Sequence, residues 1–288
     1  MTKDAHCSIT MPFAGLALAL LMAPVANAAS MDEIQERGVM NIATEDNYAP
    51  FEIMEGNTPT GFTHDVVAEL RDYADIEISQ DILPWSGLLS AVLSGRYDAA
   101  ITGSIVSEER LRVFDFSIPT ASAQHYYIKR VDDESIQGVE DLDGLTVGVQ
   151  AGSVLLSRLP ELDAMLEESG GSLGQVVEYT SYPEIYEDLA NGRLDYTVNS
   201  IISAQNVIDQ RGDEFVIGEP VSGPGFHAYP VPQGNEGVLE FINGFIEHLK
   251  DTGRLAELQE EWFGQAFPDL PDAPITSVET YRDLTGTE

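Results

Sequence analysis

Residues 95–117 read GRYDAAITGSIVSEERLRVFDFS, an apolar strand that runs into a predicted helix start. Ser107 is a residue type that caps helix N-termini, and the acids Glu108 and Glu109 follow where the helix dipole favours negative charge. Arg110 stands at the third helical position, where a capping box would place Glu or Gln. A guanidinium beside free backbone N–H groups can hold a carboxylate through two parallel hydrogen bonds. From this stretch alone, Arg110 is either part of an anion site or a solvent-facing arginine paired with a nearby acid.

The segment at residues 89–102 has a faint repeat at residues 186–199. Both copies read as a helix, a Gly stop, an Arg-x-Asp corner and a buried strand, because Gly supplies the left-handed cap that ends many helices. The repeated Asp is expected to bind backbone N–H groups at the turn. Each strand ends in a polar residue, Thr102 or Asn199. Since open α/β sheets bind ligands at the carboxyl ends of their strands, the repeat predicts two similar lobes that face one cleft.

Short apolar strands alternate with helical segments along the rest of the chain. This alternation predicts the α/β class with mainly parallel sheets. The strands are expected near residues 40–43, 99–102, 126–129, 146–150, 196–198 and 215–217, and the helices near residues 63–73, 85–94, 154–168, 182–190, 201–210 and 238–252.

Residues 1–28 predict a cleavable signal peptide. Lys3 lies in a short polar start, residues 13–23 form an apolar run, and small residues end it at 26–28. The run is shorter than the roughly 20 residues that span a bilayer, and no later stretch qualifies. The mature chain is therefore expected in the periplasm without a membrane span. Cys7 is the only cysteine and precedes the run, so we expect no lipid anchor, disulfide or cysteine metal site.

The formal charge of −35 comes from 14 basic and 49 acidic residues. Nucleic acids and anionic membrane surfaces require basic patches, so this charge argues against both as partners. The acids are spread along the chain rather than gathered in one block. Such a surface stays soluble where salt screens the repulsion between like charges, which suggests an exported protein of a saline habitat.

A second turn with the composition of an anion site spans residues 146–153, where a strand leads into small residues and then a helix. Ser153 is the expected N-cap, and Gly152 lets a ligand approach the backbone. A plain helix cap fits the same residues equally well. Tyr48 and Trp85 are aromatic candidates that serve either as core residues or as walls of a ligand pocket.

Taken together, these segments resemble the solute-binding proteins of polar amino acid ABC transporters, the family 3 extracellular solute-binding proteins. The resemblance covers about residues 32–267, and its motifs occur in the family order. They are Tyr48-Ala49-Pro50-Phe51-Glu52, Gly61-Phe62, Asp65, Trp85, Gly95-Arg96-Tyr97-Asp98, Glu109-Arg110, Asp115-Phe116-Ser117 with Pro119, Asp141-Leu142-x-Gly144, Val147-Gly148-Val149-Gln150-Ala151-Gly152-Ser153, Gly192-Arg193-Leu194-Asp195, and Gly253 with Glu261-Trp262-Phe263-Gly264.

The resemblance implies a two-lobed α/β fold, the type II-like periplasmic-binding-protein fold, with two hinge strands and a ligand cleft between the lobes. The hinge strands are expected near residues 123–127 and 219–225. The remaining acidic C-terminal tail is expected to pack loosely or to be disordered. The implied division is a signal peptide at 1–28, lobe 1 at 32–123 plus 224–267, lobe 2 at 124–223 and the tail at 268–288.

The resemblance also implies roles in the cleft. The arginine that matches Arg110 holds the α-carboxylate of the ligand, and a carbonyl at the position of Gly103 helps to bind the ligand ammonium. The backbone N–H of Ile105 and the helix start at Ser153 assist Arg110. The remaining implied lining residues are Tyr48, Trp85, Glu45 and Gln150.

Asn199 departs from the family pattern, which has an aspartate that neutralises the ligand ammonium. Either Glu45 supplies the negative charge, or the ligand lacks a free α-ammonium, as ectoine-like and betaine-like solutes do. The implied function is capture of a small amino acid or related zwitterion for an ABC permease by a monomer without enzymatic activity, cofactor or metal. Two alternatives stay open: a cyclohexadienyl dehydratase-like enzyme with Glu45 as general acid, and a ligand sensor for a membrane receptor.

Overall fold

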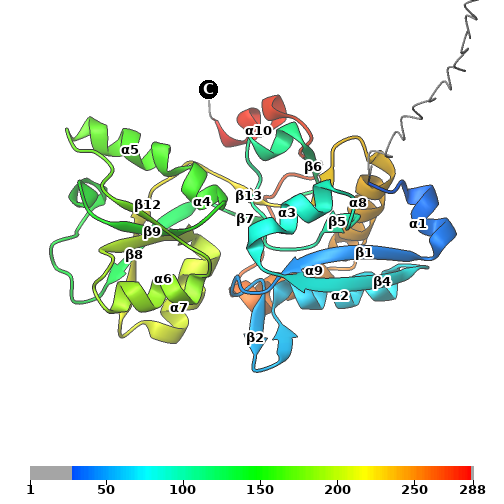
Figure 1. Cartoon of the computed structure of the whole chain (residues 1–288), viewed down its shortest axis with the longest axis horizontal. Helices are drawn as coiled ribbons and strands as arrows, with labels where there is room; N and C mark the ends of the chain where they lie inside the picture. Colours follow the sequence, from blue (N-terminus) through cyan, green and yellow to red (C-terminus); the bar gives the residue numbers. More distant parts are fainter. Residues whose placement is uncertain (1–27, 287–288) are drawn as a thin grey trace, which may run out of the picture.

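The computed structural model describes residues 28–286, so the signal prediction lies outside the described residues except for its last position. Two α/β lobes lie side by side (Figure 1). Each lobe contains its own sheet, with helices packed on both faces. The predicted α/β class and two-lobed organisation are confirmed.

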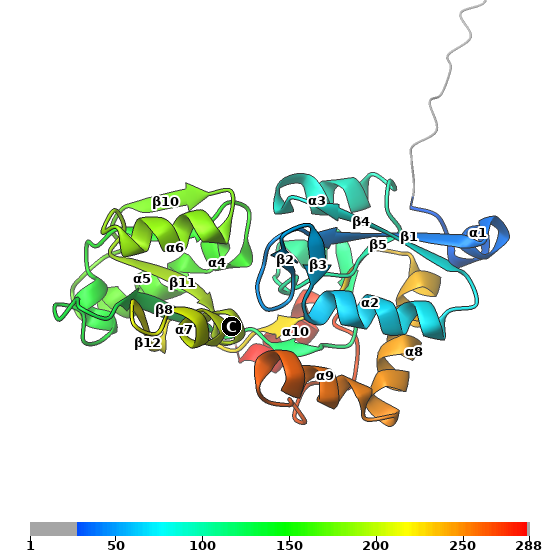
Figure 2. The same ribbon diagram turned by 90° about the horizontal axis from the view of Figure 1, so that it is seen from below.

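The first lobe is built on a parallel sheet of order β4-β1-β5, in which β1 lies in the middle. Two helices from distant parts of the chain, α2 and α9, lie side by side on one face of this sheet (Figure 2). The elements are α1 (Met31–Arg37), β1 (Val39–Glu45), β2 (Ile53–Glu55), β3 (Thr58–Thr60), α2 (Phe62–Tyr73), β4 (Glu77–Leu83), α3 (Trp85–Leu93), β5 (Ala99–Ala100), the 3-10 turn η1 (Arg110–Arg112), β6 (Phe114–Phe116), β7 (Ala121–Ser122), β13 (Phe226–His227), β14 (Pro230–Pro232), α8 (Glu236–Asp251) and α9 (Arg254–Phe263).

The second lobe has a five-stranded sheet of order β10-β9-β11-β8-β12. Strands β10, β9 and β11 are parallel, whereas β8 runs antiparallel to both β11 and β12. Its elements are β8 (His125–Arg130), the 3-10 turn η2 (Val139–Leu142), β9 (Val147–Gln150), α4 (Val154–Ser157), α5 (Leu159–Glu168), β10 (Val176–Tyr179), α6 (Tyr182–Ala190), β11 (Tyr196–Ser200), α7 (Ile201–Arg211) and β12 (Phe215–Pro220).

The chain crosses between the two sheets twice, from β7 into β8 and from β12 into β13. The crossings run side by side, because Ala123 N–H donates to the carbonyl of Gly225 at 2.8 Å and Val221 N–H donates to the carbonyl of His125 at 2.9 Å. These paired segments are the connection about which the lobes can rotate relative to each other.

The internal repeat corresponds to the units α3–β5 and α6–β11. Gly95 and Gly192 both have positive φ angles, 74° and 68°, as expected for glycines that end helices. Asp98 Oδ2 accepts the N–H of Asn41 at 2.7 Å, and Asp195 Oδ2 accepts the N–H of Thr146 at 2.7 Å. The repeated aspartate therefore has a structural role, but each carboxylate binds a backbone N–H at a neighbouring strand rather than the expected one at its own turn.

Two helix predictions are wrong in detail. The helix expected after Ser107 is only the 3-10 turn η1, so it contributes little helix dipole at Arg110. The helix expected at 154–168 is two helices, α4 and α5, that meet at Arg158. Pro160 explains the break, because proline has no N–H to continue the helical ladder.

The prediction of a loose C-terminal tail is also wrong. Ile275 is fully buried and pairs with Phe116 through two backbone hydrogen bonds of 2.9 and 3.0 Å. Helix α10 (Val278–Thr285) follows, and Ser277 caps it by accepting the N–H of Thr280. In the sequence, the apolar residues Val278 and Tyr281 form a pattern that is too short to predict a helix. The segment completes the core of the first lobe.

Tyr281→Ala is expected to destabilise the protein by about 3 kcal/mol, as large-to-small substitutions in cores do. Tyr281 is 5% exposed and packs in the cluster that contains Phe114 and Phe116. Urea unfolding measures the effect, and Leu284→Ala on the exposed side of the same helix is the control. A Tyr281→Ala variant as stable as the wild type would show that this side chain of α10 adds nothing to the core.

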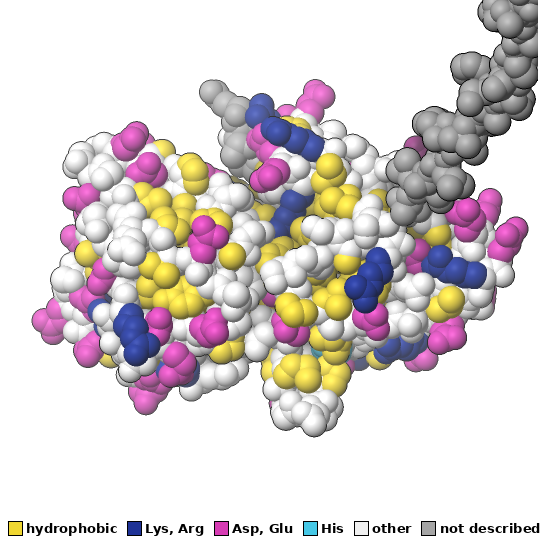
Figure 3. All heavy atoms as spheres, viewed as in Figure 1, with side chains coloured by type: hydrophobic (Ala, Val, Ile, Leu, Met, Phe, Trp, Pro, Cys, Tyr) yellow, Lys and Arg dark blue, Asp and Glu magenta, His cyan; other side chains and the backbone are white. Residues whose placement is uncertain are grey.

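Acidic side chains are scattered over both lobes on the face shown in Figure 3, with few basic side chains between them. Ion pairs use several of the arginines; Arg282, for example, binds Glu108 through two hydrogen bonds of 2.8 Å. On this face the acids are dispersed rather than gathered in one block, while adaptation to a saline habitat stays a prediction.

Candidate functional site

A narrow hollow lies between the lobes, in which the volume accessible to the centre of a water molecule is about 20 Å³. It brings together the predicted site residues except Asn199, and it adds Tyr182, Ser104, Val154 and Leu155. The residues of the first lobe that line it are Glu45, Tyr48, Trp85, Gly103, Ser104, Ile105 and Arg110, and those of the second lobe are Gln150, Ser153, Val154, Leu155 and Tyr182.

Strand ends place the polar lining residues. Glu45 is the last residue of β1, Gln150 is the last residue of β9, and Gly103 follows β5 by three residues. The carboxyl ends of these parallel strands face the interlobe gap, which is where open α/β sheets bind ligands. From the repeat, the sequence predicted Thr102 and Asn199 at this edge, but neither lines the hollow; Glu45, Gln150 and Gly103 were implied by the resemblance to the family.

Arg110 is buried, with 9% of its surface exposed. Its Nη1 donates to the carbonyl of Ile105 at 2.8 Å and to Ser104 Oγ at 3.2 Å, and its Nη2 donates to the carbonyl of Gly152 at 3.2 Å. The guanidinium lies 4.8 Å from the centre of the Trp85 ring. Arg110 is therefore not the solvent-facing arginine of the alternative interpretation, and its partners within the described residues are uncharged oxygen atoms.

Burial lowers the pKa of Arg110 to about 10, and the negative charge of Glu45 opposes this shift. The guanidinium is still charged at neutral pH. The positive charge of a buried cation is only partly neutralised when its hydrogen bonds go to uncharged oxygen atoms. An anionic group placed in the hollow would supply that compensation through charge-assisted hydrogen bonds.

Glu45 is the acidic residue of the lining, and it is 3% exposed. Its Oε1 accepts a hydrogen bond from Gln150 Nε2 at 2.8 Å, which joins the two lobes. Burial, and next the nearby carboxyl of Glu52, raise the pKa of Glu45 well above its usual value. A cationic group in the hollow would favour the ionised carboxylate.

Ser153 caps α4 as the sequence predicts, because its Oγ accepts the N–H of Leu156 at 3.2 Å. The same Oγ donates to the carbonyl of Gln150 at 2.7 Å. Gly152 has a φ of 68° and lies against Trp85, since a Cβ there would come 3.9 Å from the indole nitrogen. The cap is confirmed; contact of Ser153 with a ligand stays a prediction.

Asn199 does not line the hollow. Its Oδ1 accepts from the hydroxyl of Tyr48 at 3.2 Å and from the N–H of Ser200 at 2.8 Å, and its Nδ2 donates to the hydroxyl of Tyr186 at 2.8 Å. The side-chain amide thus joins Tyr48 of one lobe to the sheet of the other. Tyr48 also stacks on Tyr182, with ring centres 4.9 Å apart.

The sequence did not predict that two residues, Glu52 and His227, lie behind the hollow as parts of the site. Glu52 Oε1 accepts the N–H of Gly103 at 3.0 Å, and His227 Nδ1 lies 2.9 Å from the carbonyl of Gly103. A Cβ on Gly103 would come 2.7 Å from the Tyr48 ring, so only glycine fits there. The Tyr-Ala-Pro-Phe-Glu motif included Glu52, but nothing in the sequence signalled that its carboxyl reaches Gly103.

Glu52→Gln is expected to flatten the dependence of stability on pH. Burial raises the pKa of Glu52 to about 8 in the folded protein, from 4.5 in the unfolded chain. The folded state therefore binds more protons between these values, and the stability that this group contributes is lost as pH rises from 4.5 to 8. Urea unfolding at several pH values measures the slope, which Glu45 also steepens.

The control for this experiment is Glu55→Gln, since Glu55 is exposed in the neighbouring strand β2. It should leave the pH slope of the wild-type protein unchanged. A Glu52→Gln slope as steep as that of the wild type would show that Glu52 is ionised in the folded protein at neutral pH.

Within residues 28–286, the helices are too short or too polar to span a lipid bilayer. Among the same residues, no cluster of three or more His, Cys, Asp or Glu side chains is arranged to hold a metal ion.

The sequence of this chain is similar to those of known proteins. Residues 40–265 match the sequence profile of the bacterial extracellular solute-binding proteins, family 3. The chain is 27% identical to the L-cystine-binding protein TcyJ of Escherichia coli (strain K12), over 81% of this chain and 86% of the relative. It is also 27% identical to the arginine-binding extracellular protein ArtP of Bacillus subtilis (strain 168), over 77% of this chain and 85% of the relative.

Solved structures give the same result. An ancestral arginine-binding protein bound to arginine superposes with a TM-score of 0.71 at 27% identity, covering 79% of this chain and 99% of that one. The holo structure of ArgBP from T. maritima superposes with a TM-score of 0.67 at 28% identity, covering 81% of this chain and all of that one. The chain therefore belongs to the bacterial extracellular solute-binding proteins, family 3.

Proposed function

We propose that this protein is the extracytoplasmic substrate-binding component of an ABC transporter and captures an amino acid or related zwitterion by hinge closure around its carboxylate. One observation carries the proposal: the interlobe hollow is lined by one buried cation, Arg110, and one buried acid, Glu45. A zwitterion has the two complementary charges. Desolvation in a closed cleft strengthens both attractions.

The carboxylate of the ligand would bind Arg110. Its guanidinium donors are directed at the neutral oxygen atoms of Ile105, Ser104 and Gly152. A carboxylate forms stronger hydrogen bonds with guanidinium than these neutral acceptors do. In this proposal the backbone N–H of Ile105 and the helix start at Ser153 assist Arg110, and the rings of Tyr48 and Trp85 wall the hollow.

The cationic part of the ligand would face Glu45, with the carbonyl of Gly103 as a further acceptor. Asn199 cannot take this role in the arrangement described, since Tyr48, Ser200 and Tyr186 use its amide. Of the two explanations for the neutral Asn199, this favours Glu45 as the neutralising charge. The curated relatives named for cystine and arginine also support an amino acid as ligand.

In the closed arrangement, hydrogen bonds join the two lobes. Gln150 binds Glu45, the carbonyl of Gly152 binds Arg110, and Asn199 binds Tyr48. The hinge would be the paired crossings at residues 123–127 and 219–225. The same proposal includes lobe boundaries at 32–123 plus 224–267 and at 124–223. It also includes export to the periplasm, a monomeric state and docking to permease subunits.

A thermal-shift screen of the purified protein in high salt tests the function. The panel contains polar amino acids beside ectoine, betaines and other N-substituted zwitterions, and a bound solute raises the Tm by mass action. We expect a shift with one or more α-amino acids. A shift with ectoine or betaines alone would contradict Glu45 as the partner of a primary ammonium. No shift at all would contradict the proposed ligands and favour the dehydratase-like alternative, which turnover of prephenate or arogenate would test.

Asn199→Asp is expected to change the affinity for an α-amino acid that binds the wild type by less than about threefold, or 0.7 kcal/mol. The reason is that residue 199 lies outside the lining and its side chain binds protein groups. Calorimetric titration measures the Kd of both proteins. A gain of tenfold or more would instead identify Asn199 as the residue that sets the ligand class.

A further inference from the structure

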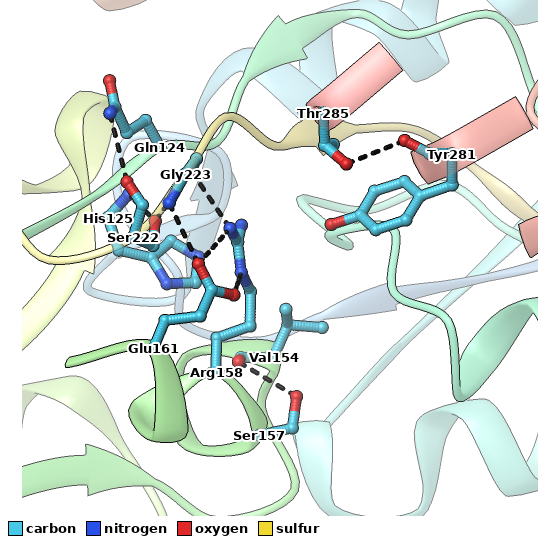
Figure 4. Close-up of polar contacts among 10 residues, drawn as sticks. All are labelled: Gln124, His125, Val154, Ser157, Arg158, Glu161, Ser222, Gly223, Tyr281 and Thr285. Atoms are coloured by element: carbon cyan, nitrogen blue, oxygen red, sulfur yellow. Dashed lines mark hydrogen bonds and ion pairs between the residues drawn. The ribbon is translucent and has the colours of Figure 1, made fainter. Parts of the chain in front are cut away.

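Outside the hollow, Arg158 and Glu161 on the second lobe hold the chain segment that returns to the first lobe (Figure 4). Arg158 binds both carboxylate oxygens of Glu161 through its Nε and Nη2. The same Nη2 donates to the carbonyl of Gly223 at 3.0 Å, and Glu161 Oε2 accepts the N–H of Gly223 at 2.9 Å. The ion pair thus binds both backbone groups of one hinge residue.

The guanidinium is packed into the hinge rather than spread on the surface. Arg158 is 8% exposed. A Cβ on Gly225 would come 2.8 Å from Arg158 Nη1 and 3.0 Å from the carbonyl oxygen of Ala123. Glycine at position 225 therefore leaves the space that the guanidinium requires between the two crossings.

The other crossing is part of the same network. Ser222 Oγ accepts the N–H of His125 at 2.9 Å, and the carbonyl of Ser222 accepts from Gln124 Nε2 at 3.1 Å (Figure 4). The second crossing is thus bound on one side by the first crossing and on the other side by the Arg158–Glu161 pair. A change in the backbone at Gly223 must disturb both sets of hydrogen bonds.

A single helical turn joins this pair to the ligand hollow. Ser153, which lines the hollow, caps the start of α4, and its carbonyl accepts the N–H of Ser157 at 3.3 Å. Arg158 ends the same turn, with its N–H donating to the carbonyl of Val154 at 2.9 Å. Val154 and Leu155 also line the hollow. The wall of the hollow and the hinge contact are therefore the two ends of α4.

We propose that Arg158 and Glu161 are positioning residues for ligand capture: they stabilise the second hinge segment in the closed arrangement and connect it, through α4, to the wall of the ligand hollow. This inference rests on the proposed capture of a solute between the lobes. Apparent affinity depends on the population of the closed arrangement as well as on ligand contacts. Loss of the pair lowers that population without removing a contact to the ligand.

The test compares Arg158→Met and Glu161→Gln with Arg211→Met. Arg211 forms the same type of pair with Glu214, through two hydrogen bonds of 2.8 Å, and also binds Glu187 at 3.0 Å; it lies at the end of α7, outside the hinge segments. Glu161→Gln keeps the shape of the side chain, so it remains informative if Arg158→Met folds poorly. Urea unfolding establishes that each variant is folded.

The first readout is the Kd for L-arginine and L-cystine. The hinge variants are expected to bind the amino acid that binds the wild type about tenfold more weakly, mainly through faster dissociation, and Arg211→Met is expected to bind like the wild type. A merely structural role would lower the free energy of unfolding. It would leave unchanged the rate at which the ligand dissociates from the folded protein. Equal Kd values in wild type and both hinge variants would overturn the inference.

The second readout needs no ligand, so it separates this inference from the proposed function. Small-angle X-ray scattering without added solute should give a larger radius of gyration for the hinge variants than for wild type and Arg211→Met. If the wild type binds no solute but the radii of gyration differ in this way, the proposed ligands would be refuted and the hinge role would stand. Equal radii in all four proteins would overturn the hinge role.

Discussion

Arg110→Ala is expected to weaken the binding of a carboxylate-bearing solute by about 2–5 kcal/mol, or roughly 30- to 5,000-fold in Kd. The guanidinium is buried in the hollow, and its hydrogen bonds go to neutral oxygen atoms. The substitution would leave a desolvated carboxylate without its charged partner, which costs more than the loss of a surface ion pair. Calorimetric titration of both proteins measures the difference.

Arg112→Ala is the matched control, since Arg112 is an exposed arginine of the same turn η1. It should bind like the wild type. Arg110→Lys is expected to fall between wild type and Arg110→Ala, because lysine keeps the charge and loses the planar fork. Retained affinity in Arg110→Ala would remove Arg110 from the ligand site.

Glu45→Gln is expected to weaken the binding of an α-amino acid by about 10- to 100-fold at pH 8, through loss of a buried charge-assisted contact. Glutamine can keep the hydrogen bond that Glu45 accepts from Gln150. Burial raises the pKa of the free carboxyl, so a cationic ligand must bind the less populated ionised form as pH falls. The wild-type affinity should therefore decrease toward low pH, and that of Glu45→Gln should depend little on pH.

Asp46→Asn is the control for the charge, because Asp46 is the next residue in the chain and does not line the hollow. Its affinity at pH 8 should follow the wild type, and its pH profile should shift toward lower pH, because the charge of Asp46 helps to raise the pKa of Glu45. Equal losses in Asp46→Asn and Glu45→Gln would show a general effect of negative charge near the cleft. A wild-type affinity that rises as pH falls would contradict an ionised Glu45 beside the ligand.

The sequence predicted the parts of the fold that local rules determine. The strands that end at Glu45 and Gln150 are short apolar runs, which the sequence predicted near residues 40–43 and 146–150, whereas the place of these two side chains in the cleft was implied by the resemblance. Gly95 and Gly192 end helices for the conformational reason that the sequence indicated. These features depend on a few neighbouring residues and need no knowledge of the tertiary packing.

The features that the sequence did not predict depend on contacts between distant segments. Asn199 was correctly placed in the last part of a strand, but the direction of its amide depends on how Tyr48 of the other lobe approaches it. Burial of Ile275 depends on backbone pairing with Phe116, which is far away in the sequence. Tyr182 enters the hollow because its ring stacks on Tyr48 across the gap. Each is a tertiary effect without a local signature.

The most direct test of the central claim is a calorimetric titration with an α-amino acid that stabilises the protein, beside the primary amide of the same molecule. The amide keeps the side chain and the ammonium and removes only the carboxylate charge. If Arg110 holds the carboxylate while Glu45 faces the cationic group, the amide should bind at least about 30-fold more weakly. Equal affinity of the acid and its amide would contradict capture through the carboxylate.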